Sequence, residues 1–170
     1  MILPGAIYFF LLFELIFVAI IDIKTKKIWN MWSIVNMAFF ILSFLLFPEQ
    51  YKFGLSLFLF PLGVLVAGLI LWMMKIMGAG DAKYLFTFFL LIPLSLHQTM
   101  LMLLAYSTIL IGLGVMMYNI TRKFKPFVFA VRTFDRVVFK MIFGTKFTYA
   151  PVILLAWIWL GWERKQYIFW

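Results

Sequence analysis

The stretch IMGAGDAKYL, residues 76 to 85, places one carboxylate, Asp81, between two long apolar runs. The chain holds only six acidic residues among 170, so this position is unusual. A carboxylate beside hydrocarbon costs free energy, and such residues usually face a polar interior and mark a functional site. Gly78 and Gly80 precede it, and glycine lets a backbone turn sharply and lets other groups approach closely. Asp81 therefore marks a turn between two apolar segments.

The composition indicates a membrane protein. Hydrophobic residues make up 66% of the chain and charged residues 12%, which is far from the balance of a soluble domain. Apolar segments recur along the whole length, so a signal peptide does not explain them. The absence of cysteine excludes disulfides, thiolate metal sites and a cysteine nucleophile. We expect residues 1–170 to form one membrane domain.

Six apolar segments are candidates for membrane spans. A helix needs about 20 apolar residues to cross a bilayer, and the candidates are residues 3–21, 30–47, 53–74, 84–96, 98–120 and 148–162. The fourth and sixth are short, so we expect them to be tilted, partly buried or set in a thinned bilayer. The predicted fold is all-α, a polytopic bundle of about six transmembrane helices.

The basic residues predict the orientation. Most of the fifteen lysines and arginines lie in the loops after the first, third and fifth spans. Cytoplasmic loops of membrane proteins carry this excess. We therefore expect a multi-pass protein of the inner (cytoplasmic) membrane with both termini outside. The net charge of +9 then reports topology, and nucleic-acid binding is not expected.

The fifth connection, residues 121–147, has the pattern of an amphipathic helix. Apolar residues including Phe127, Phe134 and Val138 follow helical spacing, while basic residues fall four apart on another face. Such a segment lies along the cytoplasmic membrane surface with its cations toward anionic headgroups. It either only connects two spans or also docks a substrate.

A second aspartate, Asp22, occupies the matching place at the end of the first span, in IIDIKTKKIWN. Two carboxylates at the same membrane face can meet inside the bundle and share a proton. Aspartic proteases use this arrangement: one carboxylate takes a proton from water and the other polarises the scissile carbonyl. The structural alternative, in which Asp22 and Asp81 pair with Lys24 and Lys83, has equal weight on this evidence.

DIKTKKIWN after the first span and GAGDAKYL before the fourth together resemble the two signatures of type IV prepilin peptidases, the Gly-x-Gly-Asp membrane aspartyl proteases. Asp22 and Asp81 match the catalytic aspartates of that family. The remaining matches, which the resemblance makes candidates for substrate positioning, are Gly78, Gly80 and Lys83 in the second motif and Asn30 at the end of the first. Trp29 stands where the family usually has proline.

The resemblance implies a reaction and a substrate. Family members cut the short basic leader from prepilin-like precursors at the cytoplasmic membrane face, just before a hydrophobic helix. Water is the nucleophile, and no metal or cofactor is needed. The chain has no cysteine-containing segment, so it is similar to the short, peptidase-only members that serve Tad-type pili, and methyltransferase activity is not expected. Archaeal preflagellin peptidases are relatives.

Two other classes of function stay open. In a small proton- or ion-coupled transporter, Asp22 and Asp81 would be ion ligands. In a non-catalytic membrane protein of pilus assembly, the chain would keep the fold of the peptidases and would not cleave a substrate. Glu14, about two turns before Asp22, is a partial candidate for a polar contact, with a buried structural role favoured.

Overall fold

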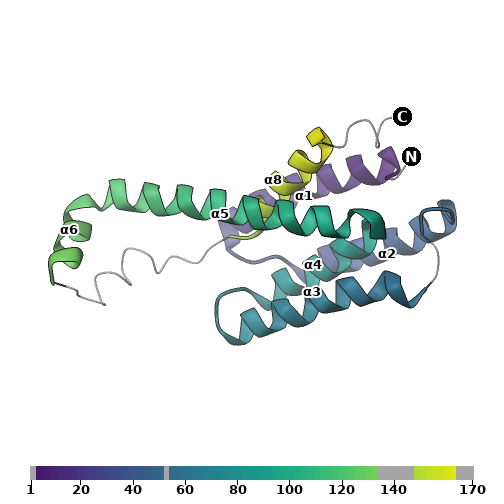
Figure 1. The fold of residues 1–170 in the computed structure, drawn as a ribbon, viewed down its shortest axis with the longest axis horizontal. Helices are drawn as coiled ribbons and strands as arrows, with labels where there is room; N and C mark the ends of the chain where they lie inside the picture. Colours follow the sequence, from purple (N-terminus) through teal and green to yellow (C-terminus); the bar gives the residue numbers. More distant parts are fainter. Residues whose placement is uncertain (1–2, 52–53, 134–147, 164–170) are drawn as a thin grey trace.

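The structure is a computed structural model that describes residues 3–51, 54–133 and 148–163, and these residues form helices and no strand (Figure 1). The all-helical prediction is confirmed. In chain order the helices are α1 (Gly5–Thr25), α2 (Asn30–Leu46), α3 (Leu55–Met73), α4 (Ala79–Leu91), the short 3₁₀ helix η1 (Leu94–Leu96), α5 (His97–Arg122), α6 (Phe124–Thr133) and α8 (Ala150–Glu163).

Helices α1, α2, α3, α5 and α8 follow five of the apolar segments closely, but α4 does not. It begins at Ala79 instead of residue 84 and ends at Leu91. Gly78 is its N-cap, and the Asp81 side chain reaches back to the N–H of Gly78, so the helix starts within the glycine-rich stretch. Pro93 follows the helix and restricts the residue before it to extended backbone, which ends α4.

The helices form two groups of three. α1 and α5 pack on α8, whereas α2 and α3 pack on α4, and the two groups lie one above the other in Figure 1. In the first group, the Trp157 ring stacks on Tyr8 and its indole N–H donates to the Tyr8 carbonyl at 3.1 Å. The start of α1 and the end of α8 lie at the same end of the bundle.

α4 is the central helix of the second group. From Tyr84 to Ile92 most of its side chains are buried, which explains how a helix of 13 residues is accommodated without spanning the full hydrocarbon thickness by itself. Its last carbonyls accept hydrogen bonds from the Tyr51 hydroxyl and from Nε2 of His97. His97 is buried and begins α5.

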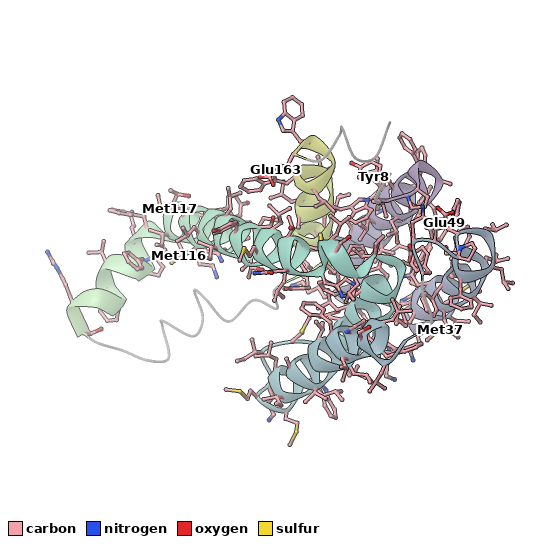
Figure 2. All side chains as sticks on the ribbon, turned by 45° about the vertical axis from the view of Figure 1, so that its right-hand side comes forward. Tyr8, Met37, Glu49, Met116, Met117 and Glu163 are labelled. Atoms are coloured by element: carbon pink, nitrogen blue, oxygen red, sulfur yellow. The ribbon has the colours of Figure 1, made fainter. Side chains whose placement is uncertain are left out.

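The outer surface is apolar, as a bilayer-embedded bundle requires. α1, α3 and the run Leu94–Arg122 are each long and apolar enough to cross a membrane. Large apolar side chains project outward along these helices, and Met116 and Met117 do so on the half of α5 that extends toward α6 (Figure 2).

α6 is a short amphipathic helix at the far end of α5 (Figure 1). It carries Lys125 and Arg132 together with exposed Phe124 and Phe129. This confirms helical structure for the first part of the fifth connection. The rest of the predicted amphipathic segment, residues 134–147, lies outside the described residues.

Two glycines of α3 give a matched test of this packing. A Cβ on Gly68 would lie 2.7 Å from the Cβ of Ala82 in α4, whereas a Cβ on Gly63 would meet nothing within 4 Å. We expect Gly68→Ala to lower the free energy of unfolding by about 1–3 kcal/mol through overpacking. Gly63→Ala, which gains the same helix propensity without the clash, should leave the free energy of unfolding unchanged or raise it by up to about 1 kcal/mol. Thermal unfolding of both variants in one detergent checks this; equal stability would contradict the α3–α4 contact.

Candidate active site

Asp22 lies in the last turn of α1 and is 2% exposed. Its Oδ2 accepts a hydrogen bond of 3.0 Å from the backbone N–H of Ala150, the first residue of α8, and the N–H of Tyr149 also bonds to it. The first N–H groups of a helix have no partner within the helix and carry partial positive charge. The carboxylate therefore caps α8 from another helix.

α1 ends at Thr25, three residues after Asp22, for a local reason. Lys26 adopts the left-handed conformation, with φ 53°, and donates its N–H to the Asp22 carbonyl at 2.7 Å. This left-handed C-cap turns the chain away from the helix axis. Asp22 consequently stays at the end of α1, facing the start of α8.

Asp81 lies in the first turn of α4, ahead of the span predicted at residues 84–96. Its Oδ2 accepts a hydrogen bond of 3.1 Å from the Gly78 N–H. Burial raises the pKa of the Asp81 carboxyl to about 6; the Gly78 N–H lowers it, and the negative charge of Asp22 raises it. The Asp22 carboxyl is therefore close enough for its charge to act on Asp81.

The pair lies where the two groups of helices meet. Asp22 comes from α1 in one group and Asp81 from α4 in the other. The groups that act on the two carboxyls are backbone N–H groups and the other aspartate, rather than Lys24 or Lys83. This arrangement differs from the structural alternative in which each aspartate pairs with a lysine.

Tyr149 is a site residue that the sequence did not single out. Its side chain lies within electrostatic reach of Asp81 and hydrogen-bonds with the Thr108 side chain on α5. Together with its backbone N–H near Asp22, this places Tyr149 beside both carboxyls. The only sequence signal was its position at the start of the span predicted at residues 148–162.

The glycines of the motif have packing roles. A Cβ on Gly80 would lie 2.5 Å from the Ile28 carbonyl oxygen, in the link between α1 and α2. A Cβ on Gly78 would lie 3.1 Å from Oδ2 of Asp81. Gly80 therefore allows a close approach of the protein's own backbone.

Asn30 and Lys83 come together away from the aspartates. Both line an apolar groove of about 600 Å³ between α2, α3 and α4, together with Met37, Leu65, Thr87 and neighbouring residues. Lys83 lies about 200° around α4 from Asp81, since successive helical residues turn by about 100°. The groove thus opens on the other side of α4 from the carboxylate pair.

Across the described residues, no three His, Cys, Asp or Glu side chains gather as they would around a metal ion. Comparisons with protein-family models, with curated proteins and with solved structures find no match for this chain. The resemblance to prepilin peptidases therefore rests on the two sequence motifs.

The cap on α8 predicts how Asp22 variants behave. Asp22→Asn keeps an oxygen that can accept the Ala150 N–H, so we expect a fold close to that of the wild type. Asp22→Leu leaves the start of α8 without this acceptor and should lower the free energy of unfolding by about 1 kcal/mol. Thermal unfolding of the two variants and hydrogen exchange at their Ala150 amide check these expectations. An Asp22→Leu protein with wild-type stability and exchange would contradict the cap.

Proposed function

We propose that the chain is an intramembrane aspartyl endopeptidase that removes the short basic leader of type IV prepilin-like precursors at the cytoplasmic membrane face. The observation that carries the proposal is the effect of one carboxyl on another from a different helix: the charge of the buried Asp22 raises the pKa of the half-buried Asp81. Each of the two motifs that resemble the prepilin peptidase signatures supplies one aspartate of the pair. Activation of water between such carboxyls needs no further functional group.

The hydrogen bonds favour different roles for the two acids. Burial acts against negative charge on both acids, but Asp22 accepts two backbone N–H groups that oppose this effect, so it is the proposed base. Asp81, with its pKa raised to about 6, holds a proton more readily and is the proposed acid. In aspartic proteases, too, the surroundings of two neighbouring carboxyls make one the base and the other the acid.

The reaction follows from these roles. Water attacks the scissile carbonyl carbon and gives one proton to Asp22, while the proton of Asp81 passes to the carbonyl oxygen, forming a diol. Asp22 then delivers its proton to the leaving nitrogen as the C–N bond breaks, and Asp81 recovers a proton from the diol. The products are a new carboxyl and a new amino terminus, and both aspartates return to their starting states.

The proposed orientation rests on exposed lysines near the pair. Lys24, Lys26 and Lys27 follow Asp22, and Lys75 and Lys83 flank Asp81 in sequence; all five are exposed. An excess of lysine at this end favours the cytoplasmic side. The proposed substrate has a hydrophobic helix that lies in the bilayer and a leader that emerges there, which brings the bond between them to the level of the carboxyls.

Transport of a small cation is favoured by a different residue, Glu14. It lies near the middle of α1 and is 4% exposed, whereas Asp22 and Asp81 lie at one end of the bundle. Ion sites of transporters lie near the bilayer midplane. Glu14 therefore supports this second function, and the aspartate pair supports the first.

The peptidase is tested with the purified full-length protein in liposomes and a prepilin-like substrate. We expect wild type to release the leader, and Asp22→Asn and Asp81→Asn each to lose at least about 100-fold in kcat/KM, because each removes one acid–base group. Glu49→Gln, an acid-to-amide change at an exposed residue, is the matched control and should cleave normally.

Mass spectrometry of the products and a thermal unfolding curve for each variant complete the test. If a folded Asp22→Asn or Asp81→Asn protein cleaves as fast as wild type, the two-aspartate mechanism is wrong. If wild type cuts none of a panel of precursors with basic leaders, the transporter and the non-catalytic assembly protein replace the peptidase.

A further inference from the structure

A second buried polar cluster lies between the two groups of helices. It consists of Glu14 from α1, Asn36 from α2 and Tyr84 from α4, with exposed fractions of 4%, 0% and 0%. Glu14 lies two turns before Asp22 on α1, about 12 Å along the helix axis. Tyr84 lies one turn beyond Asp81 on α4. The cluster is therefore deeper in the bundle than the aspartate pair, on the same sides of α1 and α4.

The polar groups of this cluster neighbour one another as hydrogen-bonding groups without completing a bond of good geometry. Tyr84 and Asn36 approach the Glu14 carboxyl closely enough to interact with it. Nevertheless, both carboxyl oxygens of Glu14, both amide atoms of Asn36 and the Tyr84 hydroxyl have no partner at hydrogen-bond geometry among the described residues. Buried polar groups in proteins are almost always bonded, to protein, to water or to an ion. A single water or ion among them would supply the partner that these atoms lack.

The donor set and the charge define that partner. The cluster offers four oxygens, two from a carboxylate, one from an amide and one from a phenol, which is the ligand chemistry of hard cations. No lysine or arginine lies in α2 or α3, and those of α1 and α4, Lys24 and Lys83, are exposed at the bundle end. One carboxylate balances one positive charge, so a monovalent ion leaves the site neutral, and a divalent ion does not.

We propose that Glu14, Asn36 and Tyr84 bind one small monovalent cation, of the sodium class, between the two groups of helices near the middle of the membrane. Because the ligands come from α1, α2 and α4, the ion joins one group of helices to the other beneath the aspartate pair. The site is separate from the proposed peptidase chemistry and holds whether or not the chain cleaves a precursor. A proton on Glu14 is the competing occupant, which the test distinguishes.

Sodium binding is tested on the full-length protein purified in detergent with choline chloride. Replacing choline by sodium at constant ionic strength should raise the unfolding midpoint of wild type saturably, by roughly 2–4 °C. Glu14→Gln should abolish the response, while Glu49→Gln, the matched change at an exposed acid, should keep it. Lithium, a smaller hard cation, should also raise the midpoint.

A second variant and a direct measurement keep the test decisive if Glu14→Gln does not fold. Tyr84→Phe removes one oxygen and keeps the ring, so the half-saturating sodium concentration should rise about tenfold. Radioactive sodium should bind to wild type at one ion per chain. The proposal is overturned if sodium and choline give the same midpoint at both pH 5 and pH 8, since a proton is then the sole occupant. A normal sodium response from folded Glu14→Gln would overturn it as well.

Discussion

The hydrogen bond from the Ala150 N–H to Asp22 joins the end of α1 to the start of α8, across 128 residues of chain. α4 begins at the same level with Asp81 in its first turn. Two helix N-termini thus meet two carboxylates, and the partial positive charge of each terminus offsets part of the cost of bringing negative charges together in an apolar bundle. This compensation allows Asp22 and Asp81 to approach, and the positions of α1, α4 and α8 follow from it.

The interface between the two groups of helices therefore concentrates the polar chemistry of the protein. Asp22 and Asp81 occupy its end, and Glu14 and Tyr84 occupy a deeper level, while the outer faces of the bundle remain apolar. Buried ionisable groups in a membrane protein are expensive and usually functional. The aspartate pair at the end of this interface is consistent with the proposed hydrolysis at the membrane surface. The deeper cluster around Glu14 is consistent with the proposed ion, which would hold the two groups of helices together.

The apolar runs predicted the helices well, because hydrophobic segments of this length have few alternatives to a helix in a bilayer. The common level of Asp22 and Asp81 was predictable too, since successive spans alternate in direction. The groups that contact these two aspartates could not be predicted from the sequence. The start of α4 depends on the Asp81 side chain, which accepts a hydrogen bond from the Gly78 N–H. The close approach of the Ile28 carbonyl to Gly80 arises only when the chain folds. The sequence made Glu14 a candidate for a polar contact with a buried structural role favoured, but it did not reveal Asn36 and Tyr84 as its neighbours, because they are distant in sequence.

The coupling between Asp22 and Asp81 is measured most directly by NMR titration of selectively labelled aspartate carboxyl carbons in wild type and in Asp22→Asn. Because the charge of Asp22 raises the pKa of Asp81, removing that charge should lower it from about 6. A clear downward shift in Asp22→Asn, with the fold retained, is the expected result. An Asp81 titration that is the same in both proteins would mean that the two carboxyls do not act on each other, and would contradict a shared catalytic site.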